Sequence, residues 1–198
     1  MAKKGAIIGS GLGGLSAAIR LAHLGYQIDL FESNSDAGGK ANQFILDDFR
    51  FDLGPSLLTM PFVIKDLFAD VDENLEDFLT LRKLDIICKY YYSDGTVINL
   101  FADRENTAHE IAKKTFDSKK SVIKYLKYCE KIYDLTAELF LFKDFSDPKT
   151  FLNLRALKTL MQIYKIDPFR TMHEANSNFF NDPKTVQLFD RYATYNGS

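Results

Sequence analysis

Three glycines near the amino terminus have the spacing that binding of a pyrophosphate requires. Gly9, Gly11 and Gly14 follow a short apolar run, residues 6–8, and precede a helical pattern. The first glycine permits a tight turn, the second leaves the backbone open to a pyrophosphate, and the third lets the helix lie close to the sheet. The N–H groups at the start of that helix favour bound phosphate. A glycine-rich loop with a purely structural role is the alternative.

One acidic residue, Glu32, stands where a second strand, residues 26–31, should end. A carboxylate at this place accepts hydrogen bonds from ribose hydroxyls and repels a 2′-phosphate, which argues against NADP. Gly25 should end the intervening helix as a left-handed cap. The apolar stripe of that helix, expected to face the sheet, consists of Leu12, Leu15, Ile19 and Ala22.

The chain after Glu32 differs from that of a nicotinamide enzyme, in which a helix and a third parallel strand normally follow. A turn, a double glycine and a cation come instead, namely Gly38, Gly39 and Lys40. An extended stretch with alternating apolar residues then leads to Gly54, Pro55 and Ser56. This order of elements favours a flavin-binding fold over a nicotinamide-binding fold.

Taken together, these segments resemble the amino end of FAD-dependent carotenoid desaturases of the bacterial phytoene desaturase type. The wider flavin amine oxidase superfamily shares the glycine turn and the double glycine, whereas the run 51–56, with 59–61 after it, favours the carotenoid branch. The specific motifs cover roughly the first 70 residues. The sequence departs from the family at Lys40, where arginine is frequent, and at Asp48, where glycine is frequent. Lys40 keeps the positive charge of arginine but lacks its planar set of donors, so a bidentate contact at this position is in doubt.

The resemblance implies FAD as the cofactor and a lipophilic polyene as the substrate. Gly9, Gly11 and Gly14 would hold the FAD pyrophosphate and Glu32 the adenosine ribose. The residues implied beside the flavin and in the rest of the cofactor site are Gly38, Gly39, Lys40, Gly54, Pro55 and Ser56. The implied reaction is desaturation of a carotenoid precursor such as phytoene by hydride transfer to the flavin.

Several alternatives to that function stay open. Within the class, the chain could be a hydroxycarotenoid 3,4-desaturase or another flavoprotein of the amine oxidase superfamily. From a different class, it could be an inactive amino-terminal fragment that binds at best the adenosine half of FAD. The catalytic acid or base is not identified, because His23, His109 and His173 each fit a surface or core position better than a catalytic one.

The fold class expected from these patterns is α/β. Residues 1–80 are assigned to the amino-terminal part of an FAD-binding Rossmann-like domain, built around a βαβ unit. Residues 81–198 are assigned to a mixed α+β, mostly helical segment of a substrate- and membrane-facing domain. Because a doubly wound sheet needs more parallel strands than the two found here, we expect an incomplete fold and a longer enzyme, with a natural short protein as the minority interpretation.

Charge, composition and the absence of certain motifs argue against nucleic-acid binding, secretion, membrane spanning and metal binding. The 198 residues carry a net charge of −2 and no basic run interleaved with aromatics, which argues against nucleic acid. Neither a signal peptide nor an apolar run of roughly 18 residues is present, so a cytoplasmic protein is expected, with peripheral contact to the inner face of the membrane left open. Cys88 and Cys129 fit reduced, buried thiols, and no residues have metal-ligand spacing. The oligomeric state is undetermined.

The second half of the chain also contains recognisable elements. Residues 61–69 predict a helix with proline in its first turn. Residues 86–93 and 96–101, joined by Asp94-Gly95, predict a β-hairpin in which at least one of three consecutive tyrosines, 90–92, faces inward. Asp103 is a plausible N-cap for a largely helical remainder. Breaks in that remainder are predicted near 145–148, 166–168 and 181–183.

A basic face is predicted on the helix spanning 118–142. Its lysines at helical spacing are Lys120, Lys124, Lys127 and Lys131. The opposite side consists of Val122, Leu126, Cys129 and Tyr133. Such a helix could lie on an anionic bilayer, although an ordinary solvated face is the favoured interpretation. The following segment, 151–161, is more apolar, and lipid contact, if any, is expected there.

Overall fold

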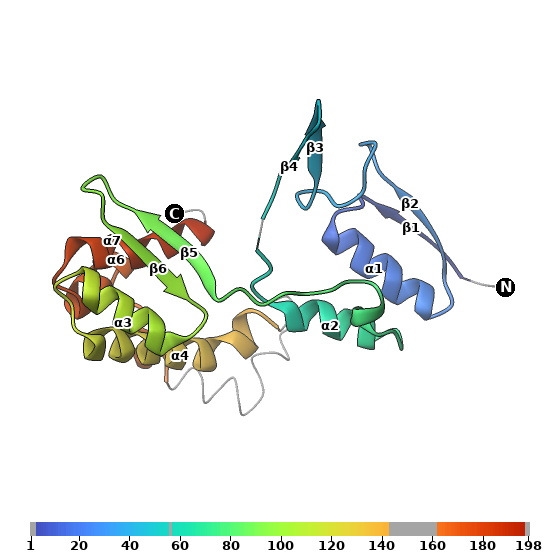
Figure 1. Cartoon of the computed structure of the whole chain (residues 1–198). Helices are drawn as coiled ribbons and strands as arrows, with labels where there is room; N and C mark the ends of the chain where they lie inside the picture. The colour runs from blue at the N-terminus through green and yellow to red at the C-terminus, as the bar shows by residue number, and fades with distance from the viewer. Residues whose placement is uncertain (1–2, 56, 143–161, 197–198) are drawn as a thin grey trace. The chain divides into compact units, whose positions relative to one another are not determined.

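The computed structural model describes residues 3–55, 57–142 and 162–196. The chain divides into two compact units, unit 1 (Met1–Arg82) and unit 2 (Lys83–Ser198), which are described separately (Figure 1). Ser56, the predicted break at 145–148 and the apolar segment 151–161 lie outside the described residues.

Unit 1 begins with a βαβ element. Strand β1 (Lys4–Ile8) pairs in parallel with β2 (Gln27–Phe31), and helix α1 (Leu12–His23) connects them. Gly25 follows the helix with φ of +84°, as predicted for a left-handed cap. Because the two strands are parallel, their carboxyl ends meet at one edge, which brings the turn after β1 beside the residue after β2.

The rest of unit 1 contains a second hairpin and a helix. Strands β3 (Gln43–Leu46) and β4 (Phe49–Asp52) pair antiparallel, and they form the extended stretch predicted after the double glycine. Helix α2 (Pro61–Ala69) has proline in its first turn, as predicted, and a short 3₁₀ helix, η1 (Leu75–Asp77), follows.

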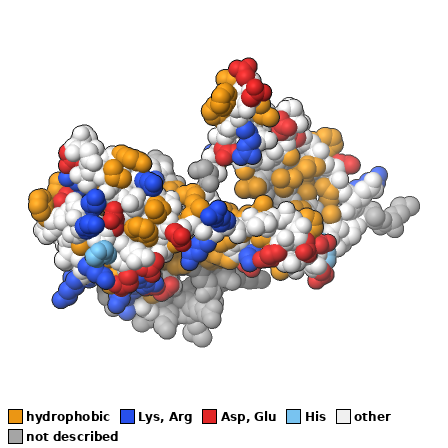
Figure 2. All heavy atoms as spheres, viewed as in Figure 1, with side chains coloured by type: hydrophobic (Ala, Val, Ile, Leu, Met, Phe, Trp, Pro, Cys, Tyr) orange, Lys and Arg blue, Asp and Glu red, His pale blue; other side chains and the backbone are white. Residues whose placement is uncertain are grey.

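Unit 1 buries little of its apolar surface. Among its described residues, Leu75 is the one hydrophobic residue that is buried, and α1 contains no buried residue. The predicted apolar stripe of α1 is therefore wrong in part, because Leu12 is 63% exposed and Ile19 is 38% exposed. Two strands offer a face too narrow to cover a helix of this length. Figure 2 shows hydrophobic side chains at the surface of this unit.

Unit 2 combines a hairpin with helices. Strands β5 (Ile86–Tyr91) and β6 (Val97–Phe101) pair antiparallel across a turn that contains Gly95 at φ of +82°, as predicted. The helices are α3 (Arg104–Lys114), α4 (Lys119–Phe140), η3 (Ile163–Ile166), α6 (Met172–Phe179), α7 (Pro183–Asp190) and η4 (Arg191–Asn196). Asp103 caps α3 by accepting a hydrogen bond from the Asn106 N–H at 2.8 Å, which confirms the predicted cap.

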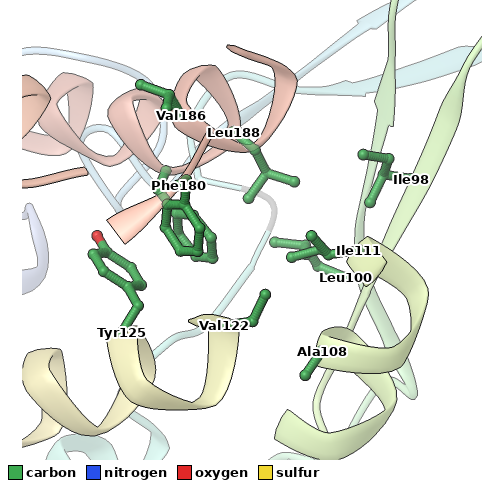
Figure 3. Close-up of a cluster of buried hydrophobic side chains, with 10 residues drawn as sticks. Ile98, Leu100, Ala108, Ile111, Val122, Tyr125, Phe180, Val186 and Leu188 are labelled. Carbon is green, nitrogen blue, oxygen red and sulfur yellow. The ribbon is translucent and has the colours of Figure 1, made fainter. Parts of the chain in front are cut away.

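A closed core holds unit 2 together. Figure 3 shows side chains from β6, α3, α4 and α7 converging on one another. The buried members are Ile98, Leu100, Ala108, Ile111, Val122, Tyr125, Phe180, Val186, Leu188 and Phe189. The Tyr125 ring lies 4.5 Å from that of Phe189 and 5.0 Å from that of Phe180, between centroids. Aromatic contacts of this kind supply a large share of the burial in a core.

The tyrosine and helix-face predictions for unit 2 had different outcomes. Tyr90 and Tyr92 pack against the core while Tyr91 is 74% exposed, so the prediction for the hairpin is confirmed. Tyr133, predicted on the apolar side of α4, is 47% exposed and that prediction is wrong. In the part of the chain that the structure describes, no helix has the length and apolar composition needed to cross a membrane.

Candidate dinucleotide-binding site

Two positions in and after the turn that follows β1 accept only glycine, one because of its φ angle and one because of a close contact. Gly9 has φ of +94°, and its N–H donates to the carbonyl of Phe31 at 2.7 Å, which ties the turn to the end of β2. A Cβ on Gly14 would lie 1.9 Å from the carbonyl oxygen of Gly9. The first turn of α1 therefore rests directly on the strand–helix turn.

Gly11 stands at the N-cap of α1 under a different constraint. Its φ is −66°, and a Cβ on it would meet nothing closer than the Cα of Gly39, at 4.0 Å. The protein itself thus leaves room for a side chain here. Among the described residues no side chain caps this helix, so its first N–H groups are available to an anionic ligand.

Glu32 reaches back from the end of β2 to the same turn. One carboxylate oxygen, Oε2, accepts hydrogen bonds from the backbone N–H and the hydroxyl of Ser10, both at 2.8 Å. The other, Oε1, accepts from the N–H of Asn34 at 3.0 Å and from its side-chain amide at 2.9 Å. The N–H groups of Asn34 and then Ser10 lower the pKa of Glu32 to about 2, so the carboxylate is charged at neutral pH.

Ser10 is a site residue that the sequence analysis missed. It is 1% exposed and links the carboxylate of Glu32 to the turn, while its carbonyl accepts from the N–H of Gly38 at 2.8 Å. The available signal was a hydroxyl residue between the first two glycines, paired with an acid at the end of the next strand.

The double glycine lies directly against the turn. Gly38 forms a parallel bridge with Gly11, and φ is positive at Gly38, +118°, and at Gly39, +61°. A Cβ on Gly39 would lie 3.0 Å from the Cα of Gly11. Two segments far apart in sequence therefore meet at close backbone distance around the start of α1.

The remaining predicted residues continue from this contact. A Cβ on Gly54 would lie 1.8 Å from the carbonyl oxygen of Lys40, so these two backbones touch. Gly54 and Pro55 line an open pocket of about 770 Å³, together with Asp36, Ala37, Ala41, Asn42, Gln43, Phe44, Ile45 and Asp52. The glycines of the turn and Glu32 do not line this pocket. The structure thus groups the turn, Glu32 and the double glycine, and places Pro55 in the adjoining pocket.

Comparison with known proteins identifies a domain model that matches part of unit 1, and relatives that match the whole chain. The NAD(P)-binding Rossmann-like domain family matches residues 7–73. The chain is 43% identical over 200 residues to the 1-hydroxycarotenoid 3,4-desaturase of Flavobacterium sp. (strain P99-3), across 99% of this chain and 40% of that protein. This match confirms the resemblance to carotenoid desaturases that the sequence indicates.

Two further relatives carry oxygenase names. The 4,4'-diaponeurosporene oxygenase of Staphylococcus haemolyticus (strain JCSC1435) is 33% identical, over 99% of this chain and 39% of that protein. The 4,4'-diapolycopene oxygenase of Methylomonas sp is 34% identical, over 97% of this chain and 38% of that protein. The chain spans about two fifths of the length of these relatives. The matched Rossmann-like domain supports a dinucleotide cofactor of the flavin or nicotinamide type.

Other side chains that could do chemistry lie in unit 2. His173 on α6 contacts Asp190 at the end of α7, with 2.7 Å between Nδ1 and Oδ2. Asp190 also accepts from the side-chain amide of Asn176 at 2.7 Å, so it joins two helices. Cys88 and Cys129 are free thiols. In the described parts of the chain no three His, Cys, Asp or Glu side chains are grouped as metal ligands.

Proposed function

We propose that this chain is part of a carotenoid desaturase, that it binds FAD through unit 1, and that the protein takes part in the desaturation of a carotenoid precursor such as phytoene. The observation that carries the proposal is the contact of the double glycine with the phosphate-binding turn, at Gly11 and Gly38. The chain forms the β3–β4 hairpin where a nicotinamide fold continues into a helix and a third parallel strand.

Each predicted residue has a proposed role in holding FAD. Gly9 and Gly14 form the turn, and Gly11 admits the pyrophosphate to the free N–H groups of α1. Glu32 accepts hydrogen bonds from the adenosine ribose. The residues proposed for the flavin side of the site are Gly38, Gly39, Lys40, Gly54, Pro55 and Ser56. When bound, FAD supplies the hydride acceptor, and the chain supplies position and shelter from water.

The substrate class comes from the relatives. Their names refer to a hydroxycarotenoid, to diaponeurosporene and to diapolycopene, so a lipophilic polyene is the proposed substrate. A hydroxycarotenoid 3,4-desaturase is a close second candidate, since the relative of that name is 43% identical. Because a polyene of this kind dissolves in lipid rather than water, we also propose a cytoplasmic protein that meets its substrate at a membrane surface.

The exposed apolar faces of unit 1 support an incomplete nucleotide domain. Ile8 is 90% exposed and Phe31 is 58% exposed, although parallel sheets are normally covered on both faces. We propose that residues 1–80 form the amino-terminal part of an FAD-binding domain, which further strands extend and further helices cover in a longer protein. Residues 81–198 would belong to the substrate domain. An inactive fragment is the alternative.

Flavin binding tests this proposal directly. FAD is added to the purified chain, and bound flavin is measured by equilibrium dialysis and by quenching of flavin fluorescence. We expect Gly11→Ala to weaken binding about tenfold or more, because its methyl group would occupy the pyrophosphate approach. Gly13→Ala is the matched control, since a Cβ there meets nothing within 4 Å. Both variants should keep the far-UV circular dichroism of the parent chain.

A second variant tests the adenosine contact. Glu32→Gln keeps the size of the side chain but weakens the acceptor, so we expect a loss of about tenfold in FAD affinity. Competition with NADH and NADPH then identifies the cofactor. Retention of FAD by both variants, or tighter binding of a nicotinamide cofactor, would contradict the proposed site.

A further inference from the structure

The connection between α3 and α4 presents a single aromatic ring to solvent. Phe116 is 91% exposed, whereas the next residue, Asp117, is 3% exposed. Scattered exposed apolar residues are common on protein surfaces, so exposure alone is no sign of a binding site. Phe116 differs from such residues because hydrogen bonds hold the backbone of this connection in place.

Hydrogen bonds fix the backbone that carries the ring. The N–H of Phe116 donates to Asp182 Oδ2 at 3.0 Å. The carboxylate of Asp117 accepts from the N–H groups of Asn181 at 2.7 Å and Asp182 at 3.2 Å. The connection is thus bound to the start of α7 on both sides of the ring. Phe116 is held outward by the fold rather than exposed by a loose loop.

Cations flank the ring on both helices. Lys113 and Lys114 end α3, and Lys119 and Lys120 begin α4. From 113 to 131 the sequence contains seven lysines and two carboxylates, although the whole chain has a net charge of −2. Figure 2 shows Lys and Arg side chains, with Asp and Glu side chains among them, over the part of unit 2 where α3 and α4 lie.

Most of this local positive charge is uncompensated. Lys119 pairs with Glu105 at 2.8 Å, and Glu130 is occupied by Arg104 at 3.1 Å. Within the described part of the chain, Lys114 and Lys120 have no carboxylate partner. They stand two residues before and four residues after the exposed ring.

We propose that Phe116 and the lysines around it form a docking site for an anionic phospholipid surface. The ring would enter the boundary between headgroups and acyl chains, and Lys114 and Lys120 would contact headgroup phosphates. A protruding ring between cations fits a flat anionic surface, whereas a nucleic acid is normally bound along a groove. The site differs from the segment 151–161 in which lipid contact was expected. It serves the proposed polyene substrate, but lipid binding and FAD binding can fail separately.

The absence of tryptophan from the sequence permits a local test. Phe116→Trp introduces a single indole whose emission reports its own surroundings, so vesicle binding through the exposed faces of unit 1 does not disturb the measurement. Vesicles of phosphatidylcholine alone are compared with vesicles containing equal amounts of phosphatidylcholine and phosphatidylglycerol. We expect the emission to shift to the blue with the anionic vesicles only, and the shift to weaken as salt is raised.

Phe169→Trp is the matched control. Phe169 is 95% exposed, but its neighbours Asp167 and Arg170 pair with each other and leave no local surplus of charge. Its emission should not change with either vesicle. In the Phe116→Trp background, Lys114→Gln with Lys120→Gln should weaken vesicle binding roughly twenty-fold, since each lysine near an anionic surface contributes a factor of about five.

Four outcomes would overturn the proposal. The first is an unchanged emission of Phe116→Trp with anionic vesicles, and the second is an equal shift at both positions. The third is a blue emission before vesicles are added, which would mean that protein covers the ring. The fourth is a response to single-stranded oligonucleotide in place of vesicles, which would identify a nucleic-acid surface instead.

Discussion

The two units differ in what they do with their apolar side chains. Unit 2 closes a core in which Ile98, Ile111 and Leu188 are fully buried. Unit 1 leaves Ile8 at 90% exposure and Phe49 at 68% exposure, and Leu75 is its one buried hydrophobic residue among those described. Unit 1 nevertheless carries the better-defined candidate site.

The geometry of the candidate site and the stability of the unit that carries it therefore depend on different interactions. The turn is shaped by contacts of a few residues: the φ of Gly9, the close approach of Gly14 and the hydrogen bonds of Glu32. Such constraints need no large core. A parallel pair of strands, in contrast, gains most of its stability from layers packed on both faces. Unit 1 therefore shows a closely fitted turn, the candidate site, on a two-stranded sheet that the described residues cover only in part.

The same substitution in the two units should give the largest contrast. Ile111→Ala removes a fully buried side chain and should lower the free energy of unfolding of unit 2 by about 3 kcal/mol, by lost burial and a residual cavity. Ile8→Ala should change stability by less than about 0.5 kcal/mol. Urea unfolding followed by tyrosine absorbance reports mainly on unit 2, which contains nine of the ten tyrosines.

Amide hydrogen exchange in β1 and α1, followed by NMR, serves for the variant in unit 1, because most of the helix that circular dichroism detects lies in unit 2. Equal losses from the two substitutions would show that Ile8 is covered in solution, and the contrast between the units would no longer hold.

The glycines of α1 offer a second contrast, inside unit 1. Gly14→Ala should cost about 2 kcal/mol, because its methyl group would overlap the Gly9 carbonyl and force the helix off the turn. Gly13→Ala should stabilise the helix by roughly 0.5–1 kcal/mol, since it meets no neighbour. Amide hydrogen exchange of α1, followed by NMR, measures both effects. If Gly14→Ala protects α1 as well as Gly13→Ala does, the turn and the helix are further apart than the structure places them.

Sequence reasoning succeeded where one residue's own chemistry decides the structure. The left-handed Gly25, the hairpin turn at Gly95 and the cap at Asp103 all follow from local backbone requirements. It failed for Leu12 and Tyr133, because the side that a helix buries depends on what packs against it.

The candidate site was also predicted only in part. The glycines and Glu32 were recognised from spacing, but two interactions depend on strands coming together first. These are the hydrogen bonds from Ser10 to Glu32 and from Gly38 to Ser10, which join residues more than twenty positions apart. No periodicity in the sequence encodes such pairings, so they became visible only in the folded chain.

Acid should weaken the link between β2 and the turn. The pKa of Glu32 is lowered from 4.5 to about 2 by hydrogen bonds to the charged form, so that form stabilises the folded state. Its contribution is fully present above pH 4.5 and is lost as the pH falls toward 2. The stability difference between the parent chain and Glu32→Gln should therefore be constant above pH 4.5 and vanish in acid. An NMR titration of Glu32 with a midpoint near 4.5 would refute this.

The last contrast concerns how each unit satisfies the first N–H groups of a helix. Asp103→Ala should lower the stability of unit 2 by about 1 kcal/mol, because the Asn106 N–H loses its acceptor, and Asp103→Asn should restore most of it. Urea unfolding followed by tyrosine absorbance measures both variants. A loss that Asn does not restore would mean that charge rather than capping matters. In unit 2 the chain caps α3 with its own side chain, whereas at Gly11 it leaves the start of α1 without a side-chain cap, and that is where the proposed pyrophosphate would bind.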